Sequence, residues 1–209
     1  MKIAVINEVS ACAKNGDIAA AIEAGVPGAA ILNLGMSDPE GLPALIYMHT
    51  GLMSAVMLNA GWCDFVVGGC GTGQGYLNSV MQYPGVFCGL IQEPLDAWLF
   101  SQINGGNCVS LALNKGYGWA GDINLKYIFE KLFCDPAGQG YPPARAETQA
   151  ESRAALRALS QRAHRPMEDI LAGTPNALWE PILQHKPFMD IVVQNAESNI
   201  AKIILSKGE

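Results

Sequence analysis

A glycine-rich segment around a cysteine is the part of the sequence best suited to chemistry. The run from Gly68 to Gly75 reads Gly-Gly-Cys-Gly-Thr-Gly-Gln-Gly, and its glycines permit tight turns and close approach of a ligand. We expect a helix to begin near Tyr76, so that free backbone N–H groups form an anion hole beside Cys70. A thiol at a helix start has a lowered pKa and can act as a base or nucleophile. The alternative is a tight strand-to-helix turn that holds a buried cysteine.

Other chemistries of glycine loops do not fit this segment. No Gly-Lys-Ser/Thr follows it, as a P-loop requires, and it does not follow the first strand, as a dinucleotide fingerprint does. Thr72 stands where a nucleophile elbow has its last glycine. A cysteine hydrolase would need a histidine base, and we expect the three histidines to be surface or packed residues (His49, His164 and His185).

The glycine-rich segment lies within an alternation of apolar strands and helical patterns. The sequence predicts helices over 11–24, 42–60, Pro94–Ile103 and 121–133, and strands over Lys2–Ile6, Ala29–Leu34, Phe65–Gly69, Val86–Ile91 and Cys108–Leu113. This alternation is typical of a parallel sheet with helices on both faces. Ligands of such sheets bind beyond the carboxyl ends of the strands, where the strand order reverses.

Polar residues follow several of these strand ends. They are Asn7, Glu8, Gln92, Glu93, Asn114 and Lys115. Glu8 is either a catalytic or binding carboxylate or the N-cap partner of a helix. The position of Asn104-Gly-Gly-Asn107 before the fifth strand favours a simple turn.

Composition excludes several classes of protein. Of the 209 residues, 50% are hydrophobic and 15% charged, which excludes intrinsic disorder. The net charge of −6 argues against a nucleic-acid partner, and no apolar run reaches the roughly 18 residues of a membrane span. The six cysteines include no C-x-x-C pair, so we expect no structural zinc site. No secretory signal is evident, which predicts reduced thiols and a cytoplasmic location. The apolar excess predicts a large core, a buried subunit interface, or both.

The composition changes near residue 135. A loop rich in glycine and proline spans 135–143, a polar helical segment spans 144–164, and Pro166, Pro181 and Pro187 are predicted to separate shorter helices. All five arginines lie in this half of the chain. We expect these helices to pack on the main domain or on a partner subunit.

An ordered set of motifs resembles a known enzyme family. Cys70-Gly-Thr-Gly-x-Gly75, Pro84-Gly-Val86, Glu93-Pro-x-x-Ala97-x-Leu99 and Asn104-x-x-Asn107 resemble the ribose-5-phosphate isomerase B / galactose-6-phosphate isomerase (RpiB/LacA/LacB) family. The resemblance implies a sugar isomerase domain over 1–147 with a helical extension over 148–209. It also implies a Rossmann-like three-layer α/β/α sandwich with a five-stranded, mainly parallel sheet. Family members form homodimers, sometimes paired into dimers of dimers, and use no metal or cofactor.

The resemblance implies aldose–ketose isomerisation through a cis-enediolate. Cys70 would be the carbon base, and Thr72 would polarise the substrate oxygen or relay protons there. The amides of Gly71, Gly73 and Gly75 would hold the enediolate. Asn104 matches a substrate-binding asparagine that the partner subunit supplies.

The chain departs from the family at several positions. Glu8-Val9 replaces an Asp-His pair, and Ile103 replaces the histidine credited with ring opening. Of the two phosphate-binding arginines, Arg145 matches the second, whereas Tyr141 stands at the first. These departures favour an acidic sugar over ribose 5-phosphate. The alternative function is a non-catalytic sugar-binding or partner subunit of a heteromeric isomerase.

Overall fold

The computed structural model describes residues 1–208 and contains one five-stranded sheet. Its strands are β1 (Lys2–Asn7), β2 (Ala30–Asn33), β3 (Phe65–Cys70), β4 (Cys88–Ile91) and β5 (Cys108–Ala112). They lie in the order β2-β1-β3-β5-β4, and all four neighbouring pairs are parallel. The predicted parallel α/β fold is therefore confirmed. From β1 the chain first adds β2 on one side and then β3 on the other side, so the strand order reverses between β1 and β3. The carboxyl ends of β1 and β3 therefore form the topological switch point.

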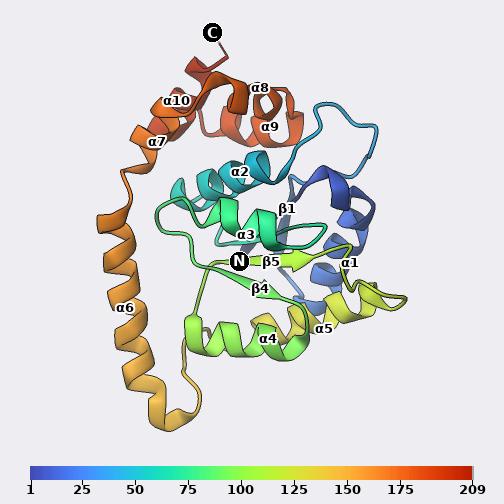
Figure 1. Ribbon diagram of the computed structural model, residues 1–209, viewed down its shortest axis with the longest axis vertical. Coiled ribbons are helices and arrows are strands. Elements are labelled where there is room, and N and C mark those ends of the chain that lie inside the picture. Colours follow the sequence, from blue (N-terminus) through green and yellow to red (C-terminus); the bar gives the residue numbers. More distant parts are fainter. Residues whose placement is uncertain (209) are drawn as a thin grey trace.

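Helices cover both faces of the sheet (Figure 1). Alternate residues of β1 face opposite layers, as the two-residue period of a strand requires: Ala4 and Ile6 join one core cluster, and Ile3 and Val5 join the other. The first cluster contains residues of α2 (Tyr47–Asn59) and α3 (Gln74–Val80). The second contains residues of α1 (Asn15–Gly25), α4 (Pro94–Leu99) and α5 (Gly121–Phe133). The result is a three-layer sandwich.

Several predicted helices and strands begin or end at other residues in the structure. The first helix begins as a 3₁₀ turn, η1 (Val9–Lys14), before α1. The second begins at Tyr47 rather than at 42, because the proline-containing segment before it remains a loop. The predicted helix Pro94–Ile103 is α4 followed by a π-helical turn, η2 (Phe100–Asn104). The fourth strand starts at Cys88 because the Phe87 N–H donates to the Asn107 side chain (2.9 Å).

The C-terminal residues form a short 3₁₀ turn and five helices. They are η3 (Pro143–Arg145), α6 (Ala146–Ala163), α7 (Met167–Gly173), α8 (Asn176–Gln184), α9 (Lys186–Gln194) and α10 (Asn199–Ser206). In Figure 1, α6 runs along one side of the molecule and leads to α7–α10, which gather beyond α2.

The last four helices share a core with the sheet domain. Trp179, Phe188 and Ile204 are fully buried in the same cluster as Leu52 of α2. Pro181 lies inside α8 rather than at a helix boundary, so that expectation is wrong. Burial of Trp179 and Ile182 on either side of Pro181 outweighs the one helical hydrogen bond that proline cannot donate. None of the described helices is long and apolar enough to cross a membrane.

Candidate active site

The glycine loop follows β3 at the switch point. Cys70 is the last residue of β3 and is 5% exposed, whereas Thr72 is exposed. The Cys70 Sγ and Thr72 Oγ1 atoms lie 4.0 Å apart. Gly73 is the N-cap of α3 with φ of +75°, a left-handed conformation that favours glycine. The loop therefore brings a thiol and a hydroxyl together at the start of a helix.

Backbone amides line the same turn. The Gln74 N–H donates to Thr72 Oγ1 (3.3 Å), which orients the threonine side chain. The first N–H groups of a helix have no acceptor within it, so the amides of Gly73 and Gly75 are available to an anionic oxygen. Whether these amides hold a substrate oxygen stays a prediction.

Neighbouring segments hold the loop in place. The N–H groups of Asn114 and Lys115 donate to the Gly71 carbonyl at 3.0 and 2.8 Å, and Leu113 N–H donates to the Cys70 carbonyl at 3.0 Å. The Asn114 side chain donates to the Ser10 carbonyl (2.8 Å). The segments after β1 and β5 thus fix the loop between them, as a crevice at a switch point requires.

Glu8 lies beside this loop. Its N–H donates to the Gly69 carbonyl (3.2 Å), and its side chain is 6% exposed. Glu8 occupies the N-cap position of η1, but its carboxylate makes no cap bond and instead accepts a hydrogen bond from the Ser10 hydroxyl. A buried carboxylate with one internal partner has lone pairs left for a substrate hydroxyl.

Two further residues near the loop were not predicted to form part of the site. Ser10 holds the Glu8 carboxylate, and no pattern in the sequence indicated it. Tyr47 packs over the start of α3, where a Cβ on Gly75 would lie 3.0 Å from its ring. The exposed polar motif Asn-Lys after the fifth strand did indicate Asn114.

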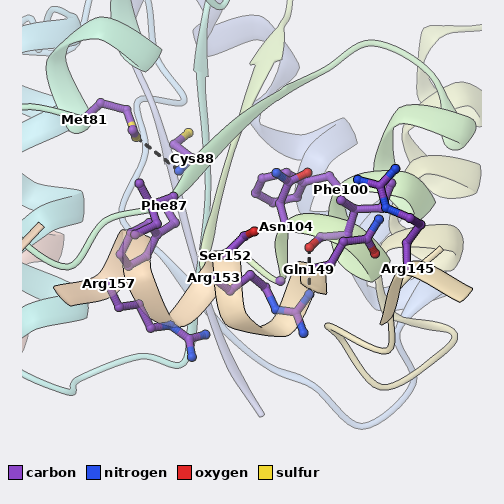
Figure 2. A pocket seen from close by; sticks show the side chains of 13 residues that line it. Met81, Phe87, Cys88, Phe100, Asn104, Arg145, Gln149, Ser152, Arg153 and Arg157 are labelled. Carbon is purple, nitrogen blue, oxygen red and sulfur yellow. Dashed lines mark hydrogen bonds between the residues drawn. The ribbon is translucent and has the colours of Figure 1, made fainter. Parts of the chain in front are cut away.

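A second candidate region lies at the opposite end of the sheet. A cavity of about 370 Å³ is lined by residues of η2, the start of β4 and one side of α6. Figure 2 shows the side chains that line it. Asn104 and Arg145 both line it, so the structure brings these two predicted substrate-binding residues together. The apolar part of its wall comes from Met81, Phe87, Phe100, Ile103 and Leu156.

This cavity is cationic. Arg153 and Arg157 of α6 line it together with Arg145, and among residues 1–208 no Asp or Glu does so. In Figure 2, Arg145 and Arg157 lie toward opposite ends of the cavity. The sequence shows that the arginines cluster in the second half of the chain. It did not indicate that Arg153 and Arg157 would line a cavity together with residues of η2 and β4. Such a cavity suits an anionic ligand.

Tyr141 lies outside the lining of this cavity. Its ring packs edge-on against Trp98, with centroids 5.2 Å apart. Gln149 holds the Tyr141 backbone by accepting from its N–H (2.9 Å) and donating to its carbonyl (2.7 Å). The role of Tyr141 in substrate binding stays a prediction.

The three histidine side chains contact backbone groups. His49 Nδ1 accepts from the Ile46 N–H (3.1 Å) at the start of α2, and burial lowers the pKa of His49. His185 Nε2 lies 2.9 Å from the Leu34 carbonyl oxygen, and burial lowers the pKa of His185 as well. His164 Nδ1 lies 2.9 Å from the Ser160 carbonyl oxygen. These contacts agree with packed histidines.

Comparison with known proteins identifies the family. Residues 3–131 match the family described as Ribose/Galactose Isomerase. The chain belongs to this family. No curated protein matches it by sequence.

Two similar solved structures span almost the whole chain. One is a 4-deoxy-L-threo-5-hexosulose-uronate ketol-isomerase complexed with a tartrate, with 38% identity, a TM-score of 0.94 and coverage of 99% of both chains. The other is a ribose-5-phosphate isomerase from Vibrio parahaemolyticus, with 39% identity, a TM-score of 0.93 and the same coverage. A type B ribose 5-phosphate isomerase from Trypanosoma cruzi shares the fold at 18% identity and a TM-score of 0.67, over 78% of this chain and 98% of its own.

Proposed function

We propose that this chain interconverts the aldose and ketose forms of an acidic, open-chain sugar, with Cys70 as the carbon base. That the chain is a sugar aldose–ketose isomerase follows from its family and from relatives that match it end to end. The observation that carries the mechanism is the Cys70–Gly75 loop, which combines a thiol, a hydroxyl and helix-start amides at one point.

The reaction needs a base, an oxyanion cradle and a proton donor for oxygen. Cys70 Sγ takes the proton from the carbon next to the carbonyl and returns it to the neighbouring carbon. The amides of Gly71, Gly73 and Gly75 hold the enediolate oxygens between these steps. Thr72 polarises or relays protons at the substrate oxygen. The Glu8 carboxylate binds a substrate hydroxyl, and no metal or cofactor takes part in this route.

A second copy of the chain would complete the site. The glycine loop lies at the start of α3, whereas Met81, just beyond the end of α3, lines the arginine cavity. The two regions are therefore separated by about 10 Å of helix. A two-fold axis between the two regions would place each glycine loop opposite the partner's arginine cavity. In such an isologous interface, the loop of the first copy faces the cavity of the second, and the loop of the second faces the cavity of the first.

The exposed surface supports such a dimer. In the part of the chain that the structure describes, Ser160 is the only buried residue of α6. Leu156 and Leu159 of the same helix are 51% and 59% exposed. Ile46, Tyr47 and Met81 add exposed apolar area near the two regions. Neighbouring apolar side chains of this kind mark a protein interface. We propose a homodimer, or a dimer of such dimers, in the cytoplasm.

The substrate's anionic group would bind in the arginine cavity. Ile103 lines this cavity at the position where the resemblance places a ring-opening histidine, which favours a sugar that is already open. The uronate ketol-isomerase that matches this chain over 99% of its length supports a carboxylate as the anion. We therefore favour a deoxy-ketouronate over ribose 5-phosphate.

Side-by-side kinetics test the proposal. The purified protein should convert 4-deoxy-L-threo-5-hexosulose uronate and incorporate solvent deuterium into it, with much lower activity on ribose 5-phosphate. Turnover of ribose 5-phosphate without turnover of the uronate would show that the substrate assignment is wrong. Absence of deuterium exchange with both sugars would favour the non-catalytic partner subunit.

A further inference from the structure

Arg153 joins two separate segments of the arginine cavity. Its Nη1 donates to the Ile103 carbonyl (2.9 Å), and its Nη2 donates to the Gly138 carbonyl (2.6 Å). These acceptors lie 50 and 15 residues before it in the sequence. One guanidinium on α6 therefore connects η2 with the loop that precedes η3, and Figure 2 shows it in the middle of the cavity wall.

Two glycines form the slot that receives this side chain. Gly105 and Gly138 have φ of +52° and +79°, in the left-handed region. A Cβ on either would lie 3.2 Å from an atom of Arg153, closer than most side chains tolerate. Both segments thus adopt conformations that leave space for the arginine and aim a carbonyl at it.

The two segments carry the substrate-binding groups of the cavity. Asn104 directly follows Ile103, and Arg145 ends the turn that follows the Gly138 loop. The backbone N–H of Gly138 also donates to the Ser101 carbonyl (2.8 Å), so the loop already lies against η2. Arg153 adds a fork of two charge-assisted bonds at the junction, and these bonds constrain both segments at once.

We propose that Arg153 is the positioning residue that sets Asn104 relative to Arg145 and so shapes the anion-binding half of the site. The proposal rests on the proposed function, in which this cavity holds the anionic group of the substrate. Because anion binding stabilises the ground state and the transition state alike, its loss raises KM more than it lowers kcat.

The test compares Arg153→Ala with Arg162→Ala. Arg162 is an exposed arginine near the end of the same helix and does not line the cavity, so its removal controls for charge and helix propensity. Tartrate binding, measured by calorimetry, and KM and kcat for the uronate are the readouts. We expect Arg153→Ala to weaken tartrate binding and raise KM by about 10-fold or more, with kcat changed much less.

Chemical rescue separates positioning from general stability. Millimolar guanidinium should enter the vacated slot of Arg153→Ala and restore tartrate binding, whereas sodium chloride at the same ionic strength should not. Arg153→Lys should fall between wild type and Arg153→Ala, because an ammonium lacks the planar fork that reaches two diverging carbonyls. This second variant keeps the test informative should the alanine variant fail to fold.

Three results with the variants would overturn the proposal. In the first, Arg153→Ala binds tartrate as tightly as Arg162→Ala does. In the second, guanidinium does not restore the weakened tartrate binding of Arg153→Ala. In the third, Arg153→Lys is indistinguishable from wild type in tartrate binding and KM. Wild-type protein that binds neither tartrate nor inorganic phosphate would also overturn it. Anion binding that depends on Arg153, without isomerisation of any sugar, would contradict the proposed function alone.

Discussion

Cys70 and Asn104 lie at opposite ends of the strands of the sheet, Cys70 at the carboxyl end and Asn104 at the amino end. Cys70 is the register partner of Ala112 at the carboxyl end of β5, whereas Asn104 precedes Cys108 at the amino end of that strand. Ala112 is four residue steps along β5 from Cys108, a distance of about 13 Å. One chain therefore does not bring the proposed base and the proposed binding asparagine to one substrate, which supports the proposal of a site shared between two copies.

A shared site predicts complementation between inactive variants. Cys70→Ala and Asn104→Ala should each have little activity as homodimers. After equal mixing and exchange, half of the dimers are hybrids with one intact site each, so about a quarter of wild-type activity should return. Activity is measured after mixing at a concentration where sedimentation shows exchanged dimers. Proven hybrids without recovery, or a monomer in sedimentation, would contradict the shared site.

Removal of the proposed base should abolish catalysis while the fold remains. Cys70→Ala is expected to slow isomerisation and deuterium exchange by on the order of 10²–10⁴, as the loss of a general base does. Cys134→Ser is the matched control, because Cys134 is an exposed thiol at the end of α5. Near-normal turnover by Cys70→Ala, with circular dichroism like that of wild type, would exclude Cys70 as the base.

Arg145→Ala should weaken substrate binding. The variant loses a charge-assisted bond to the substrate anion, so KM should rise by about 10- to 100-fold with a small change in kcat. Steady-state kinetics on the uronate measure both constants. A fall in kcat at unchanged KM would instead place Arg145 at the reacting carbons.

The buried histidine between the extension and the sheet domain predicts a pH effect on stability. Burial lowers the pKa of His185 from its ordinary value of 6.5, and the neutral ring can donate to the Leu34 carbonyl. Below pH 6.5 the unfolded chain then binds more protons at this residue than the folded chain does. This contribution to stability is present above pH 6.5 and is lost as the pH falls through the lowered pKa.

Urea unfolding of wild type and His185→Gln across this pH range tests the effect. Glutamine can donate to the same carbonyl without titrating, so the variant should lose less stability on acidification. His49, whose pKa burial also lowers, continues to contribute in both proteins. The matched control is His164→Gln, on a more exposed histidine. Equal pH dependence of His185→Gln and wild type would contradict the assignment.

Features that depend on local patterns could be predicted from the sequence. The apolar run Phe65–Gly69 predicted a strand because parallel strands buried on both faces consist almost entirely of apolar residues and glycine, and the observed strand extends one residue further, to Cys70. The loop after that strand was recognisable because glycine spacing controls the turn locally. The start of α2 at Tyr47 was missed, since the apolar spacing begins before it while the segment that contains Pro43 remains a loop.

Contacts between residues far apart in the sequence could not be predicted, because they depend on how separate elements pack. Arg153 and Arg157 reach the cavity because α6 packs along η2, a contact between segments some 50 residues apart. Tyr141 packs its ring against Trp98 outside the cavity that Arg145 lines. Asn104 and Cys70 are kept apart by the length of β5. Each outcome depends on packing between separate elements, and residue type and spacing along the chain do not specify such packing.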